Sequence, residues 1–207
     1  MSSFLRPMPL VISYYTLGTP YEEEVKYLIR SCEQFGVDSL IEGIPCKGSW
    51  EANCAFKPFF IREKMKELQR PLFWVDADAV FLQTPDLALF LDHDFAVLQL
   101  SDAVDINHRI RASSVFINTT FEGYNILEAW CKNSEDAIKE HGQAPAFLDQ
   151  ISLYLELKHN QSAEVAQMPL SYCKVFDYDS VLIDQKLVVI EQNQASRRLR
   201  SFFQAKA

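Results

Sequence analysis

The chain has 207 residues, of which 48% are apolar and 23% are charged, and its formal net charge at pH 7 is −8. This length suffices for one domain with a sizeable core and is too short for two typical domains, so we expect a single domain over residues 1–207. The acidic balance argues against a surface for nucleic acid or anionic membranes. An acidic protein that handles an anionic substrate needs a local cation, either a metal ion or a basic cluster.

The five cysteines are widely spread, and none stands in a Cys-x-x-Cys or Cys/His zinc spacing. This pattern predicts free thiols in a reducing compartment. No apolar run approaches the ~18 residues of a membrane span, and the first residues show no signal-peptide pattern. We therefore expect a cytoplasmic protein without a transmembrane segment.

The first half of the chain alternates between strand and helix patterns. In order, we expect a strand at 8–16, a helix at 20–35, a strand at 37–44, a loop at 45–53, a helix at about 55–68 and a strand at 71–75. This β-α-β-α-β order is the signature of a parallel sheet covered by helices, so the expected fold class is α/β.

The start of the first helix has a strong sequence signal. Thr19 is expected to cap it, Pro20 to take the first helical position and Glu22 to complete a Thr-x-x-Glu capping box. Gly36 is expected to end this helix.

The apolar run 71–75 ends abruptly in Asp76-Ala77-Asp78. Side chains at i and i+2 of a strand point to the same side, so we expect both carboxylates to leave the strand end in one direction. A divalent cation would remove their mutual repulsion and gain two hard oxygen ligands. The carboxyl edge of a parallel sheet is also where open α/β folds bind ligands. The alternative is a simple turn or helix cap.

The second half is less regular. We expect strands at 94–100 and 113–119, a helix with apolar positions from Phe121 to Trp130, and a helix that starts at Pro145 with Leu148, Ile151, Leu155 and Leu157 on its apolar face. Short strands are expected at 165–168, 181–183 and 187–190, followed by a basic tail with Arg197, Arg198 and Arg200.

Two enzyme classes carry Asp-x-Asp after an apolar strand. Haloacid-dehalogenase-type phosphatases use it to close the first strand of their core, with the first aspartate as nucleophile. Here two βα units precede Asp76, and the nearest later acidic pair, Asp102 and Asp105, comes early and lacks the accompanying glycine. A phosphohydrolase with Asp76 as nucleophile and Asp78 as acid/base is therefore kept as an alternative.

The order of the downstream motifs resembles GT-A type nucleotide-diphospho-sugar transferases. The Asp-x-Asp is followed by Ser-Ser-Val-Phe-Ile-Asn-Thr-Thr at 113–120, a Trp-bearing helix, Asp149-Gln150 and a closing segment at 190–197. The resemblance covers about residues 8 to 200. It implies a single-domain GT-A fold, with a central, mostly parallel sheet flanked by helices. It also implies a glycosyltransferase that moves a sugar from a nucleotide-diphospho-sugar, a UDP-sugar, to a glycan, lipid or protein acceptor.

The resemblance also implies residue roles. Asp78 would be the main ligand of a Mn²⁺ or Mg²⁺ ion, and Asp76 would contact both the ribose and the metal. Asp149, with Gln150 beside it, would stabilise the oxocarbenium-like anomeric carbon or take the acceptor's proton. The implied nucleotide-sugar-binding residues are Tyr14, Tyr15, Thr16, Lys57, Asp76, Ala77, Ser114, Asn118 and Arg197.

One position departs from the family pattern. The closing segment of such transferases commonly presents a histidine as third protein ligand to the metal, and Gln192 takes that place here. An amide oxygen is a weaker donor than imidazole to Mn²⁺-like ions, although Mg²⁺ tolerates it. A non-catalytic nucleotide-sugar-binding protein is therefore the second alternative.

Overall fold

The computed structural model describes residues 6–100, 105–177, 179 and 181–197. Its main sheet has six strands in the order β2-β1-β3-β6-β5-β7. These strands are β1 (Leu10–Thr16), β2 (Ser39–Ile44), β3 (Leu72–Val75), β5 (Phe95–Gln99), β6 (Ile110–Ile117) and β7 (Val165–Gln167). The pairs β1–β2, β1–β3 and β5–β7 are parallel, whereas β6 runs antiparallel to both of its neighbours. The expected α/β class with a mostly parallel sheet is confirmed.

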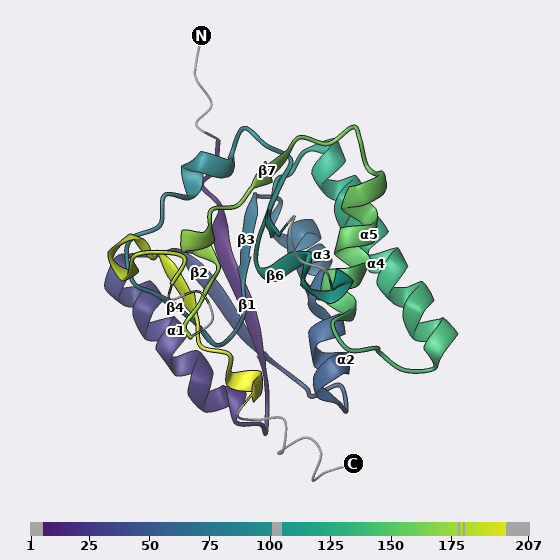
Figure 1. Ribbon diagram of the computed structural model, residues 1–207, viewed down its shortest axis with the longest axis horizontal. Helices are drawn as coiled ribbons and strands as arrows, with labels where there is room; N and C mark the ends of the chain where they lie inside the picture. Colours follow the sequence, from purple (N-terminus) through teal and green to yellow (C-terminus); the bar gives the residue numbers. More distant parts are fainter. Residues whose placement is uncertain (1–5, 101–104, 178, 180, 198–207) are drawn as a thin grey trace.

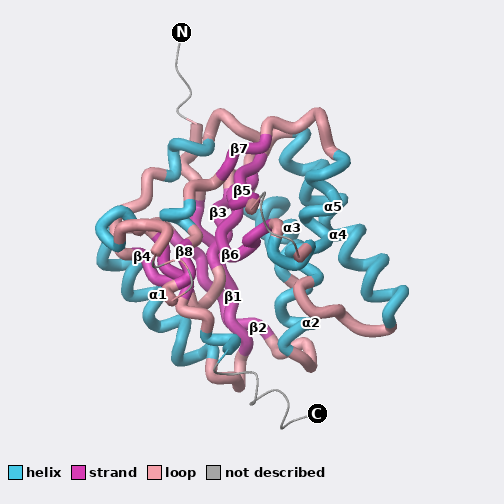
Figure 2. Tube along the Cα trace, in the orientation of Figure 1, coloured by secondary structure: helices cyan, strands magenta, loops and turns pink. Residues whose placement is uncertain are grey.

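Helices cover both faces of this sheet (Figure 1). The helices α3 (Lys57–Leu68), α4 (Phe121–His141) and α5 (Leu148–His159) lie on one face, with the short α2 (Trp50–Ala55) below them. The other face carries α1 (Tyr21–Phe35) and a small sheet in the order β4-β9-β8. Its strands are β4 (Ala79–Phe81), β8 (Lys174–Val175) and β9 (Ile190–Gln192). Figure 2 shows the strands of the main sheet between the two groups of helices.

Alternation along the central strands divides the core into two clusters. Ile12 and Trp74 pack with residues of α3, α4 and α5, whereas Val11 and Phe73 pack with residues of α1 and the small sheet. All four side chains are at most 2% exposed. Burying a side chain of this size contributes about 1.5–3 kcal/mol, so both layers are held to the sheet mainly by apolar contact.

The predicted capping box at the start of α1 is wrong. Thr19 Oγ1 accepts a hydrogen bond from the backbone of Tyr21 at 3.3 Å, and the Glu22 carboxylate accepts one from Gly18 at 2.9 Å. Pro20 takes the N-cap position, so the helix begins one residue later than expected. Its predicted end is confirmed, because Gly36 adopts a left-handed conformation with φ of 62°.

Two further helix starts differ from the expectation. The expected loop at 45–53 contains the beginning of α2, where Ser49 Oγ accepts a hydrogen bond from Ala52 N at 3.0 Å. The helix expected from Pro145 begins only at Leu148, because Phe147 has a positive φ of 58° that does not continue into a right-handed helix.

The end of the chain was the least predictable part. The expected strand at 181–183 is wrong: these residues form a turn, and Val181 is 89% exposed. The expected strand at 187–190 begins only at Ile190, after a 3-10 turn over Gln185–Leu187. The described part of the chain holds no helix that is both long and apolar enough to span a membrane.

Candidate active site

A cavity of about 480 Å³ opens at the edge of the main sheet where β1 and β3 end. Because β6 runs antiparallel, its first residues reach the same edge. Other parts of the lining come from α2, the first turn of α5 and the closing segment with Gln194, Ser196 and Arg197. This edge of an open α/β sheet is the expected place for a ligand.

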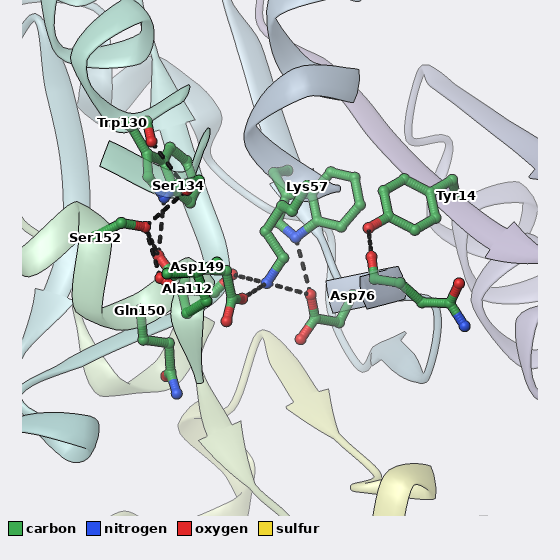
Figure 3. Close-up of polar contacts among 12 residues, drawn as sticks. Tyr14, Lys57, Asp76, Ala112, Trp130, Ser134, Asp149, Gln150 and Ser152 are labelled. Carbon is green, nitrogen blue, oxygen red and sulfur yellow. Dashed lines mark hydrogen bonds and ion pairs between the residues drawn. The ribbon is translucent and has the colours of Figure 1, made fainter. Parts of the chain in front are cut away.

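A buried lysine from the first turn of α3 lines the cavity and lies between the carboxylates of Asp149 and Asp76 (Figure 3). The Lys57 side chain is only 5% exposed, and its Nζ lies 2.7 Å from Asp149 Oδ2 and 3.0 Å from Asp76 Oδ1. It also donates to the carbonyl of Ala112 at 2.8 Å. Burial lowers the pKa of Lys57, but the two carboxylates outweigh it and hold the pKa above its usual value. The lysine is therefore a permanent cation that joins two acidic groups.

Asp76 lies in the turn after β3 rather than on the strand, since Val75 is the last strand residue and Ala79 N donates to Asp76 O at 3.0 Å. Its Oδ1 also accepts a hydrogen bond from Trp74 Nε1 at 2.9 Å. Desolvation raises the pKa of Asp76, and the Lys57 ammonium opposes this shift. The side chain is 35% exposed, so this carboxylate is accessible from the cavity.

The second aspartate is more deeply placed. Asp78 is 8% exposed, and its Oδ2 accepts a hydrogen bond from the backbone of Ala195 at 2.6 Å. Its carbonyl accepts one from Asn193 N at 3.1 Å, so the closing segment is tied to Asp78 twice. Burial, followed by the negative charge of Asp76, raises the pKa of Asp78 to about 6. The expectation from strand alternation does not apply, because a turn carries both residues, yet both line the cavity.

The predicted third metal ligand lies elsewhere. Gln192 is 1% exposed in β9 and does not line the cavity. Its Nε2 donates to Ser114 Oγ at 3.2 Å, and its buried Oε1 has no hydrogen-bond partner. Two residues later, Gln194 has a positive φ of 52° and does line the cavity.

Most of the other predicted site residues come together at the cavity. Its lining includes Tyr14, Tyr15, Thr16, Lys57, Asp76, Ala77, Asp78, Asp149, Gln150 and Arg197. Arg197 Nη1 pairs with Asp177 at 2.7 Å. Its expected companions Arg198 and Arg200 lie outside the described residues.

Two of the predicted nucleotide-sugar-binding residues, Ser114 and Asn118, do not line the cavity. Ser114 is completely buried and donates to the carbonyl of Tyr172 at 2.7 Å, whereas its neighbour Ser113 lines the cavity. Asn118 follows the end of β6, which lies at the opposite edge of the sheet because the strand is antiparallel. Its amide donates to the carbonyl of His93 at 2.8 Å.

Sequence reasoning missed a set of aromatic and polar lining residues. They include Tyr21, Trp50, Asn53, Asn107, His108, Arg111, Phe147 and Gln194. Tyr21 follows the N-cap of α1, and burial and the Asp78 carboxylate raise its pKa, so its hydroxyl stays protonated. Arg111 donates to both oxygens of the fully buried Asp179. Of these residues, Trp50 had a sequence signal: an aromatic residue in a segment expected to be a loop suggests either a loop anchor or an acceptor platform.

Comparison with known proteins identifies the class of fold. No family model and no curated protein matches the sequence. The structure is similar to that of a glycosyltransferase involved in the glycosylation of the major capsid of PBCV-1. The TM-score is 0.65 and the identity 10%, over 96% of this chain and 100% of the other.

It is also similar to the glycosyltransferase GlyE of Streptococcus pneumoniae TIGR4, with a TM-score of 0.57 and 15% identity over 97% of this chain. The apo form of GlyE has the same TM-score, with 14% identity. The chain spans 60% of the length of GlyE. This single-domain α/β fold is therefore one that glycosyltransferases have.

The pairing of Lys57 predicts a large stability effect. Lys57→Met should lower the free energy of unfolding by about 3–5 kcal/mol, because it leaves the Asp149 carboxylate buried without its cation. Urea denaturation checks this. The control is Lys66→Met on the same helix, whose 60% exposed side chain pairs with Glu128 and should contribute less than about 1 kcal/mol. Equal losses for the two variants would show that the Lys57 bridge does not hold the site.

The raised pKa of Asp78 predicts that replacing its carboxyl group stabilises the fold, and that this stabilisation depends on pH. The folded protein binds this proton more tightly than the unfolded chain, so Asp78 destabilises the fold as the pH rises from about 4 through about 6. Asp78→Asn, measured with EDTA, should therefore raise the free energy of unfolding at pH 7.5, by up to about 3 kcal/mol. The gain should vanish near pH 4. A gain of the same size at both pH values would contradict the shift.

Proposed function

We propose that the protein is a metal-dependent glycosyltransferase of the GT-A type, which transfers a sugar from a nucleotide-diphospho-sugar, a UDP-sugar, to an acceptor. The observation that carries this proposal is the position of Asp76 and Asp78. Both line one cavity at the carboxyl ends of β1 and β3, in a fold that glycosyltransferases share.

The donor set supports a divalent cation completed by substrate. Among the described residues, no group of three or more His, Cys, Asp or Glu side chains could hold a metal ion. Two carboxylates together with phosphate oxygens are, however, a common way to bind Mg²⁺. A cation would also relieve the repulsion that helps to raise the pKa of Asp78. Such a Mn²⁺ or Mg²⁺ ion would supply charge neutralisation for the leaving diphosphate.

Lys57 and Asp149 have separate roles: Lys57 positions Asp149, and Asp149 contacts the reacting groups. Lys57 Nζ lies 2.7 Å from Asp149 Oδ2 and holds this buried carboxylate in place. Asp149 is then available to stabilise positive charge at the anomeric carbon or to accept the proton of the acceptor hydroxyl. Gln150, which follows it, donates to the carbonyl of Asn107 at 3.3 Å and would orient the sugar beside Asp149.

The donor nucleotide would bind at the end of β1. Tyr14, Tyr15 and Thr16 line the cavity there, and Tyr21 adds a protonated hydroxyl near Asp78. Arg197 also lines the cavity, where it would contribute positive charge to the diphosphate. The 480 Å³ of the cavity lies within the usual range of small-molecule sites.

The phosphohydrolase alternative fits the geometry less well. Its nucleophile, Asp76, has Oδ1 engaged by both Lys57 and Trp74. Asp105 accepts a hydrogen bond from Asn107 N at the start of a 3-10 turn and does not line the cavity. Asp102 lies outside the described residues. The non-catalytic binder has the same donor contacts, and only the products separate it from a transferase.

Metal-dependent nucleotide binding is the first test. UDP with Mn²⁺ should raise the melting temperature, with a linkage gain of about 2.7 kcal/mol at a UDP concentration ~100 times its dissociation constant. Excess EDTA should abolish the gain, and Asp78→Asn should remove most of it. The control variant Asp136→Asn, on the exposed surface of α4, should behave like the parent protein.

Three outcomes distinguish the classes. Slow release of UDP from a UDP-sugar with Mn²⁺ supports a transferase. Release of inorganic phosphate from simple monoesters would identify a phosphohydrolase, and metal-dependent UDP binding without any turnover would identify a binder. Equal stabilisation by UDP with and without EDTA would contradict the proposed metal site.

A further inference from the structure

Three aromatic side chains form one wall of the cavity. Trp50 comes from α2, His108 from the 3-10 turn before β6, and Phe147 from the residue before α5. The rings of Trp50 and Phe147 meet edge to face with centroids 6.5 Å apart, and those of His108 and Phe147 lie 5.6 Å apart. These three residues, the aromatic wall, all line the cavity.

The backbone at Phe147 is held in an unfavourable conformation. Its φ of 58° and ψ of 21° place a bulky residue in the left-handed region, which costs free energy and is concentrated at functional sites. The carbonyl of Phe147 accepts hydrogen bonds from Gln150 N and Ile151 N, both at 3.0 Å. One strained residue thus places the ring in the wall and starts the helix turn that carries Asp149.

Polar groups that suit an uncharged, hydroxyl-rich ligand border the wall. Gln150 and Asn107 line the cavity and are joined by a hydrogen bond of 3.3 Å. The Asp149 carboxylate lies two residues from Phe147. A pyranose ring presents a flat C–H face, which packs on aromatic rings, and a rim of hydroxyls, which pairs with amides and carboxylates.

The charges of the cavity argue against a phosphorylated acceptor. The lysine and arginines of the lining all have acidic partners: Lys57 with Asp76 and Asp149, Arg111 with Asp179, and Arg197 with Asp177. With Lys57 and Arg111 held by carboxylates and Arg197 assigned to the donor diphosphate, no described cation of the lining is left for a second phosphate on the acceptor.

We propose that the aromatic wall binds a saccharide acceptor, with Asp149 facing its reacting hydroxyl. The role of this saccharide as acceptor rests on the proposed function, whereas its binding to the aromatic wall can be measured without turnover. The acceptor specificity then depends on Phe147 and Trp50, not on the residues that hold the donor.

Trp50 provides a direct readout. Of the three tryptophans, Trp74 and Trp130 are at most 2% exposed, whereas Trp50 is partly exposed. Iodide quenching of fluorescence therefore reports mainly on the aromatic wall. Cellobiose, maltose and N,N′-diacetylchitobiose are titrated with UDP and Mn²⁺ present, and at least one should protect Trp50. Saturation-transfer NMR of the same disaccharide should show its C–H protons in contact with the protein.

Matched variants test the ring itself. Phe147→Leu should weaken disaccharide binding about tenfold, because it removes the flat face at similar volume, and Phe147→Tyr should retain it. Phe121→Leu, a change on a 78% exposed side chain of α4, is the control and should leave binding unchanged.

The contrary results are distinct from a failure of the proposed function. If UDP stabilises the protein but no disaccharide protects Trp50, the saccharide site is wrong and sugar transfer still stands. If farnesyl phosphate or a serine-containing peptide protects Trp50 from iodide quenching and the disaccharides do not, the proposal of a saccharide acceptor is also contradicted. Disaccharide binding without any binding of UDP would support the saccharide site and contradict the proposed transfer from a UDP-sugar.

Discussion

The architecture of the cavity depends on one buried cation. Lys57 Nζ, from α3, contacts the carboxylate of Asp149 on α5, the carboxylate of Asp76 after β3 and the carbonyl of Ala112 in β6. Burying an ammonium group is costly unless its partners surround it, and each buried carboxylate has the same requirement. The three elements that carry these partners must therefore meet at this point. A site formed in this way is prearranged before any substrate arrives, which suits a reaction that develops charge.

The same charge balance explains why Asp78 differs from its neighbour. Asp76 and Asp149 share the Lys57 cation, whereas the Asp78 carboxylate accepts hydrogen bonds from the backbone amides of Ala195 and of Asp78 itself. Burial, followed by the negative charge of Asp76, outweighs these hydrogen bonds and raises the pKa of Asp78 to about 6. Near neutral pH the cavity contains acidic charge that Lys57 alone does not balance. A divalent cation would offset this acidic charge and so allow an anionic diphosphate donor to bind beside the two aspartates.

Much of the fold could be predicted from local signals, because the β-α-β-α-β order and the acidic turn after β3 need only short-range patterns. The features that could not be predicted depend on pairing between strands that are far apart in the sequence. Nothing local shows that β6 runs antiparallel, and this reversal brings Ser113 to the cavity and Asn118 to the far edge. The strands β4, β8 and β9 have two or three residues each, too few for a periodic signal. Their pairing buries Gln192 and leaves Gln194 at the cavity.

The central claim is that Asp76 and Asp78 hold the metal of a nucleotide donor. Anomalous diffraction at the manganese edge, from crystals grown with UDP and MnCl₂, tests it most directly. We expect one anomalous peak between the two carboxylates, with the diphosphate of UDP bound to the same ion and the uridine toward the end of β1. A peak elsewhere, or UDP bound in the cavity with no manganese beside Asp78, would contradict it.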